Sequence, residues 1–437
     1  MTADSRTATA SSAPSGTVTP ASGWVAFRSR DFTLFCIARF ISATAFMMQS
    51  VALGWLIYDL TGSALALGLA GLVAFLPVVS LALFAGHAAD RYDRRAILLI
   101  CAVVGTAAGA GLLLAVAHGS PPVWLIYLLI LVFGATRAFA NPTGQALLPG
   151  LVPVEHFPNA VTWTSSAWQV ATVVGPALGG VLYAFGGSVV FAFATACYAI
   201  TGVFYALVRT RSAARPREPI SWNALLAGLR FIRSRPVIFG AISLDLFAVL
   251  LGGATALLPI FARDILHVGP SGLGLLRSMP AIGAVSMAIW LARFPVRRRA
   301  GPIMFAAVGV FGLATIGFGL SRSKPLSLAC LFLLGAADMI SVLIRQTLVQ
   351  IDTPDAMRGR VAAINALFIG ASNELGEFES GTVAAIAGTV AAVVIGGAGS
   401  MLVAALWTPL FPPLWRRDQL VEQPVPTPVD EPTPRLG

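Results

Sequence analysis

Charged residues are scarce in this sequence, and their scarcity excludes a water-soluble protein. Only 11% of the 437 residues are charged, 57% are hydrophobic, and the mean hydropathy is +0.82, whereas about a quarter of the residues in a soluble domain are charged. Apolar runs of about 20 residues, long enough to cross a bilayer as helices, follow one another along the chain. The sequence therefore predicts an all-α membrane protein embedded in the lipid bilayer.

Lysine, cysteine and histidine are also rare. The only lysine, Lys324, lies in Ser-Lys-Pro, so the G-x-x-x-x-G-K-[ST] loop that holds nucleotide phosphates is missing, and this chain alone is not expected to use ATP. The four cysteines are far apart inside apolar runs, and the four histidines lie at the ends of runs or in loops. We therefore expect no metal site, no cofactor and no enzyme.

Twelve apolar runs are present, and each is predicted to form one transmembrane helix. The segment 146–153 resembles the segment 347–354, at an offset of 201 residues that is about half the chain. Two parallel six-helix repeats form two pseudo-symmetric bundles in one large class of transporters, with the substrate held between them. The predicted spans are 33–58, 63–89, 96–117, 122–148, 160–185, 188–208, 236–262, 271–293, 302–320, 326–348, 360–386 and 389–411.

The net charge of +10 would suggest a nucleic-acid partner in a soluble chain. Here the arginines cluster between every second pair of apolar runs, which is the positive-inside pattern of membrane proteins. We therefore expect no nucleic acid and place both termini in the cytoplasm. The predicted organisation is a disordered N-terminus at 1–30, a bundle at 31–208, a basic linker with an amphipathic helix at 209–235, a bundle at 236–411 and a disordered tail at 412–437.

A charged motif connects the second and third predicted spans. It consists of Gly86, Asp90, Arg91, Arg94 and Arg95. This run resembles the G-x-x-x-D-R-x-x-R-R signature loop of the major facilitator superfamily, although Asp93 stands where many members have glycine. The resemblance implies the major facilitator fold and a gating role in which Asp90 latches the cytoplasmic side against the second bundle. The alternative is a positive-inside anchor alone.

A glycine–proline motif lies in the fifth predicted span. Gly175, Pro176, Gly179 and Gly180 combine a missing backbone hydrogen bond with room for a close helix neighbour. The run resembles the G-P-x-x-G-G motif of superfamily antiporters, with Ala171 where a further glycine is usual. Because symporters of the superfamily usually lack the motif, the resemblance favours export. A purely structural kink is the alternative.

Carboxylates inside the predicted spans are costly, so they are candidates for coupling transport to protons. Glu374 and Glu377 lie three residues apart and share one helix face, whereas Glu379 points away from both. Three carboxylates within about two turns cannot all stay ionised in a membrane without partners, so at least one is expected to be protonated at rest. Asp338 and Asp245 are further candidates. Fixed ion pairs with Arg137 or Arg277 are the alternative.

Intramembrane arginines and aromatic side chains are the candidates for binding a substrate. Arg137 resembles the arginine of the superfamily's proton-relay motif, although the residues after it depart from that motif, and it is also a candidate for binding an anion or for fastening helices. Apolar and aromatic surfaces accept varied apolar shapes, and guanidinium groups favour carboxylates and catecholates. The substrate candidates are Arg39, Arg137, Arg345, Phe46, Met48, Phe139 and Phe247.

The runs at 347–360 and 372–381 resemble the superfamily branch that includes the bacterial enterobactin exporter and related secretion effectors. The resemblance covers about residues 30–412 and implies export of an amphiphilic small molecule by proton antiport, driven by the proton-motive force. We expect a monomeric, multi-pass protein of the bacterial inner membrane, and a siderophore, secondary metabolite or drug-like substrate. The alternatives are a proton-coupled uptake symporter of the same fold and a membrane scaffold or receptor that does not transport.

Overall fold

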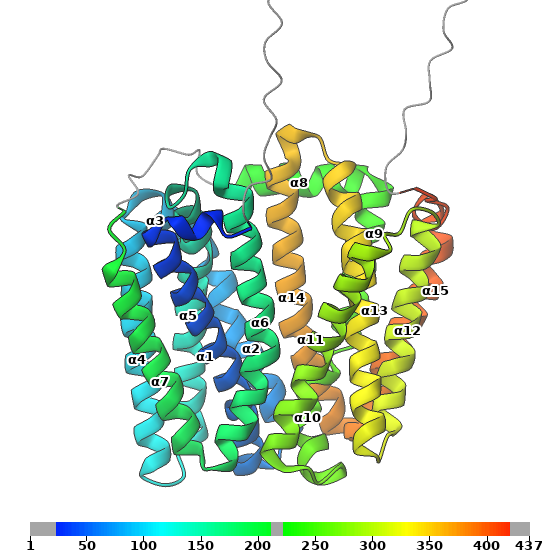
Figure 1. Ribbon diagram of the computed structural model, residues 1–437. Helices are drawn as coiled ribbons and strands as arrows, with labels where there is room; N and C mark the ends of the chain where they lie inside the picture. Colours follow the sequence, from blue (N-terminus) through cyan, green and yellow to red (C-terminus); the bar gives the residue numbers. More distant parts are fainter. Residues whose placement is uncertain (1–22, 211–221, 420–437) are drawn as a thin grey trace, which may run out of the picture.

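The computed structural model describes residues 23–210 and 222–419, and within these ranges the chain is helical, with no strand. Seven helices form the first half of the molecule, on the left of Figure 1. They are α1 (Arg30–Thr61), α2 (Ala64–Ser80), α3 (Ala82–Arg91), α4 (Arg94–Ala117), α5 (Val123–Leu147), α6 (Phe157–Ala184) and α7 (Gly187–Leu207).

The second half follows a helix that crosses one end of the molecule, α8 (Trp222–Ser234), in the segment where the sequence predicts an amphipathic helix (Figure 1). The helices of this half are α9 (Pro236–Leu251), α10 (Leu258–Ile260), α11 (Gly269–Arg293), α12 (Ala300–Leu320), α13 (Lys324–Ile351), α14 (Asp355–Ala387), α15 (Thr389–Leu410) and α16 (Pro412–Trp415).

Within the described ranges, ten helices are long and apolar enough to cross a membrane, or eleven if α2 and α3 together form one span. The remaining long helix, α14, has 33 residues but carries polar and acidic residues in its middle. The protein is therefore a multi-pass membrane protein, and the predicted count of twelve is compatible with the structure.

Two predicted spans are not single helices. The span predicted at 63–89 is the pair α2 and α3, bent by 47°, because Pro77 lacks an N–H and its ring obstructs the helical hydrogen bonding just before the break at Leu81. The span predicted at 236–262 ends as an α-helix at Leu251 and continues through short helical turns to Ile265. At this break Gly253 approaches α14 so closely that a Cβ would lie 2.4 Å from the Gly376 carbonyl oxygen.

The two halves meet at two equivalent helix crossings, α2 on α14 and α6 on α11. In the first, a Cβ added to Gly381 would lie 2.7 Å from the Cα of Gly68, and in the second, a Cβ added to Gly180 would lie 2.7 Å from the Cα of Gly274. Only glycine permits backbones to approach so closely. The two crossings are therefore related by the predicted repeat, in which α2 corresponds to α11 and α6 to α14.

The halves are fastened together near one membrane face. We call the end where α3 meets α4 the basic face, at the top of Figure 1, and the other end the opposite face. Near the opposite face Arg263 pairs with Asp59 at 2.9 Å, and the Tyr58 hydroxyl donates to Asp264. The glycine crossings lie toward the same face. The halves are therefore closed at the opposite face.

The described ends of the chain are more ordered than predicted. Residues 1–22 and 420–437 of the predicted disordered termini, and 211–221 of the predicted linker, lie outside the described residues. The prediction is wrong for Val25–Arg28, which form a 3-10 turn, and for Pro412–Trp415, which form α16. The N–H groups of Ala300 and Gly301 donate to the carbonyl oxygens of Asp418 and Arg417, so backbone hydrogen bonds hold the start of the predicted tail.

Candidate functional site

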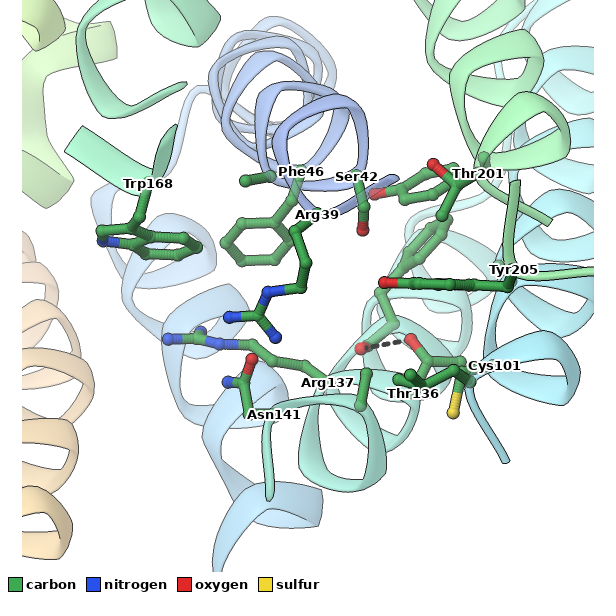
Figure 2. Close-up of a pocket in the computed structure, with 17 residues that line it drawn as sticks. Arg39, Ser42, Phe46, Cys101, Thr136, Arg137, Asn141, Trp168, Thr201 and Tyr205 are labelled. Atoms are coloured by element: carbon green, nitrogen blue, oxygen red, sulfur yellow. Dashed lines mark hydrogen bonds between the residues drawn. The ribbon is translucent and has the colours of Figure 1, made fainter. Parts of the chain in front are cut away.

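Two neighbouring cavities lie inside the bundle. The first-half chamber, with about 780 Å³ of empty space including open solvent, is lined by side chains of α1, α4, α5, α6 and α7 (Figure 2). The central chamber, with about 1120 Å³ of empty space including open solvent, is lined by both halves. Phe46, Phe133 and Arg137 line both. These three side chains therefore form the boundary between the chambers.

An ion pair joins the halves in the central chamber. The Arg137 Nη1 atom, from the middle of α5, lies 3.1 Å from Glu374 Oε1, from the middle of α14. Their side chains are 33% and 17% exposed, and the Arg137 guanidinium also lies 5.0 Å from the centre of the Phe46 ring. Charged side chains in the middle of a membrane-spanning helix are rare unless they are paired or functional.

A second pair lies beside the first in the same chamber. Arg277 of α11 lies 3.7 Å from Glu377 of α14 and donates to the Ser50 hydroxyl of α1. Glu374 and Glu377 thus face the same chamber, as their three-residue spacing predicts. The alternative that the sequence left open, pairing with Arg137 and Arg277, is what the structure contains.

The first-half chamber is cationic. Arg39 of α1 and Arg137 of α5 point into it, beside Asn141 and the rings of Phe46 and Trp168 (Figure 2). No carboxylate is among the described residues that line it. Hydroxyl groups of Ser42, Thr136, Thr201 and Tyr205 complete its polar surface, as Figure 2 shows.

Asp245 and Asp338 lie elsewhere, within the second half. Asp245 of α9 pairs with Arg345 of α13 at 3.1 Å, and the two side chains are only 8% and 3% exposed. Arg345 also donates to Asn365 of α14. Asp338 lines a small cavity together with Asp245. This cluster lies outside both chambers, and Arg137 contacts Glu374 rather than Asp338.

Only some of the predicted substrate residues reach a chamber. Arg39, Arg137 and Phe46 do. The other four, Met48, Phe139, Phe247 and Arg345, line neither chamber. Met48 is fully buried, and Phe247 is 40% exposed and packs on Trp407. Arg345 pairs with Asp245. Sequence reasoning placed them by depth, but it could not fix the direction in which each side chain points.

The arginines of the signature loop bind helix ends of the first half. Arg94 donates to the carbonyl oxygens of Ala89 and Ala146, each at 3.0 Å, and Arg95 donates to those of Tyr205 and Ala206. Carbonyl groups at helix ends lack helical partners and attract cations. Asp93 accepts from the Arg95 N–H and caps the start of α4, so it suits the turn where many relatives have glycine.

The proposed latch is not made in this arrangement. Among the described residues Asp90 makes no hydrogen bond or ion pair. A Cβ added to Gly86 would have no neighbouring atom within 4 Å, so no helix packs closely on this glycine. α3 packs instead against α2, α4 and α5. The role of Asp90 and Arg91 in gating therefore stays a prediction.

The glycine–proline motif lies at the contact between α6 and its neighbours. A Cβ at Gly175 or Gly179 would lie within 2.6 Å of Met47 or Met48 of α1, while Gly180 contacts α11. α6 continues through Pro176 as one helix. These residues let α6 pack on both halves; their connection with antiport stays a prediction.

Several lining residues were missed by sequence reasoning. Asn141 follows Arg137 by four residues and so shares its helix face, a signal that could have identified it. Gln49 lines the central chamber, and its Oε1 atom is buried without a hydrogen-bond partner among the described residues. Trp168 of α6 had no such signal, because nothing in its local sequence shows that α6 faces α1 there.

Comparison with solved structures supports the fold. A bacterial homologue of the human lysosomal transporter Spinster, in an inward-facing and unoccupied conformation, superposes with a TM-score of 0.69 and 14% identity over 89% of this chain and 96% of that one. The nucleoside transporter NupG superposes with a TM-score of 0.66 and 16% identity over 87% and 99%. At these identities the likeness concerns the fold alone.

Two helical bundles around a charged central cavity define a transporter of the major facilitator type, not an enzyme. Within that superfamily the chain belongs to the transmembrane secretion effector family, whose profile matches residues 21–432. The enterobactin exporter EntS of Citrobacter koseri is 30% identical over 385 residues, covering 85% of this chain and 86% of that protein. The protein of the same name from Escherichia coli O1:K1 is 29% identical over 379 residues, with the same coverage.

Proposed function

We propose that this protein is a secondary active exporter that moves an amphiphilic small molecule by proton antiport and alternating access. Similarity to the enterobactin exporters supports export and a siderophore, secondary metabolite or drug-like substrate. The protein would act as a monomer in the bacterial inner membrane, with both termini in the cytoplasm and the proton-motive force as its only energy source. The basic face then lies in the cytoplasm.

The observation that carries the proposal is the Arg137–Glu374 ion pair between the halves. As long as both groups are charged and no ligand is bound, this pair resists separation of α5 from α14, because breaking it leaves two charges with less hydration than in water. Protonation of Glu374 removes one charge. An anionic group of a substrate competes with Glu374 for Arg137. Either event weakens the connection and permits the halves to rock.

The Arg137–Glu374 ion pair favours antiport over symport. An antiporter must not reorient when empty, because an empty return after proton entry would dissipate the gradient without exporting anything. A symporter, in contrast, must reorient when empty. An ion pair that holds the unloaded protein in place and opens for either the proton or the substrate therefore suits the antiporter.

The direction of coupling is tested in proteoliposomes with an acidic lumen. Antiport predicts that adding a catecholate or carboxylate siderophore outside causes substrate uptake together with proton loss from the lumen, measured with an enclosed pH dye. Proton movement in the same direction as the substrate would identify a symporter. Transport of cationic dyes alone would contradict the proposed substrate class, and absence of any transport would favour the scaffold alternative.

The signature loop has its own test within this proposal. We propose that Asp90 contacts the second half when the basic face closes, so Asp90→Asn should slow transport at unchanged membrane abundance. Arg28→Gln, an exposed residue near the same face, is the matched control and should transport normally. Normal transport by Asp90→Asn would show that Asp90 does not act as a latch.

A further inference from the structure

The two halves use equivalent helix positions in opposite ways. Aligning the start of α1 with that of α9 places Arg39 opposite Asp245, and aligning the start of α5 with that of α13 places Arg137 opposite Asp338 and Gly144 opposite Arg345. In both halves the first of these positions contacts the third. Asp245 touches Arg345 in the second half, and a Cβ at Gly144 would lie 2.6 Å from Arg39 Nη1 in the first.

The charge balance, however, is reversed. In the second half Arg345 neutralises Asp245 within the protein. In the first half the acid is replaced by Arg39 and the arginine by Gly144, so this position carries a positive charge with no carboxylate partner among the described residues. Among the described residues Arg39 forms no ion pair or hydrogen bond; its guanidinium lies 6.0 Å from the centre of the Phe35 ring. Arg39 is half-buried, and a partly desolvated guanidinium without a carboxylate neighbour favours an anionic partner.

The surroundings of Arg39 are those of a binding site. It faces the first-half chamber, which is open to solvent and lined by both polar and aromatic side chains. Arg137 and the amide of Asn141 point to the same space, and Phe46 and Trp168 supply flat apolar walls (Figure 2). Gly144 leaves the room that the guanidinium occupies.

We propose that Arg39 and Gly144 form an anion subsite in which a planar oxyanion, a carboxylate or catecholate, completes the ion pair that the second half makes with its own side chains. Arg39 binds the oxyanion with two parallel hydrogen bonds, the aromatic walls hold the body of the molecule, and Gly144 positions Arg39. The inference rests on the proposed function in one respect: the bound anion is taken to be the exported molecule.

The test compares 2,3-dihydroxybenzoate with its neutral amide, 2,3-dihydroxybenzamide, by equilibrium dialysis against the purified full-length protein. The wild type should bind the anion about tenfold more tightly or better, since a hydrogen bond to a charged group contributes at least that much. Arg39→Gln should lose this preference and Arg39→Lys should keep part of it. Gly144→Ala should also reduce it, because the added methyl group displaces the guanidinium, while Arg28→Gln should retain it.

A second readout uses the wild type, so it does not depend on any variant folding. Cys101 lines the same chamber, and its alkylation by a maleimide is followed by mass spectrometry of its peptide. The benzoate should protect Cys101 at concentrations at which the amide does not. Equal protection by both compounds, or an unchanged preference in a folded Arg39→Gln protein, would overturn the subsite.

The outcomes separate the subsite from the proposed function. If the wild type shows the anion preference but moves no compound against a proton gradient, the exporter proposal fails and the subsite stands. If the wild type is a proton-driven exporter and Arg39→Gln binds and transports the benzoate normally, the subsite fails and the exporter stands.

Discussion

The first and second halves place polar side chains at the same helix positions, yet only one of the two sets is sealed. Asp245 and Arg345 are almost fully buried and pair with each other, whereas Arg39 and Arg137 face a chamber, and of these two only Arg137 has a carboxylate partner among the described residues. A charge in a membrane helix can therefore serve in two ways. When it is paired inside the protein, the charged group holds helices together. When it faces a cavity, the group can bind a ligand or exchange a proton.

Substitution of the two arginines, Arg345 and Arg39, distinguishes a charge that holds helices together from one that faces a cavity. Arg345→Gln leaves Asp245 buried and unpaired next to Asp338, so the free energy of unfolding should fall by about 3–5 kcal/mol. Arg39→Gln is the matched variant at the equivalent contact of the first half and should change it by less than about 1 kcal/mol. Denaturant unfolding in detergent measures both. Equal losses would show that Arg39 stabilises the first half as strongly as Arg345 stabilises the second.

The contacts between the halves come next. Gly381→Ala puts a Cβ 2.7 Å from the Cα of Gly68, so α14 and α2 must separate, at a cost of about 1–3 kcal/mol. Separation at this crossing opens the opposite face. Gly370, on the same helix with nothing within 4 Å of an added Cβ, is the control; alanine there should be neutral or stabilising by about 0.5–1 kcal/mol. A neutral Gly381→Ala would show that the close crossing is not needed.

The smallest effect lies at the signature loop of the first half. Arg95→Gln removes the cation that binds the last carbonyl groups of α7, and should lower the free energy of unfolding by about 1 kcal/mol. The neighbouring Arg91 is exposed, and Arg91→Gln should leave stability unchanged. Thermal unfolding followed by size-exclusion chromatography distinguishes the two. If both variants unfold like the wild type, the arginines of the loop do not act as helix caps.

Local patterns in the sequence predicted much of this architecture. The apolar runs predict the long helices, and the spacing of Glu374 and Glu377 correctly predicts that both face one cavity. The bend after Pro77 could have been read from the proline. The partner of Glu374 could not, because Arg137 lies 237 residues away in the chain and only the packing of α14 between the halves brings them together. The direction of Phe247 likewise depends on neighbours that no local pattern reveals.

Replacing Glu374 by glutamine tests whether the Arg137–Glu374 ion pair couples proton movement to transport. The substitution removes the charge that holds Arg137 but keeps the shape of the side chain, so the empty protein should reorient freely. In proteoliposomes we expect Glu374→Gln to lose substrate accumulation driven by a pH gradient, while net movement of substrate down its own gradient persists and no longer requires protons to move in return. Accumulation at the wild-type level, or loss of downhill movement as well in a correctly folded variant, would contradict the account.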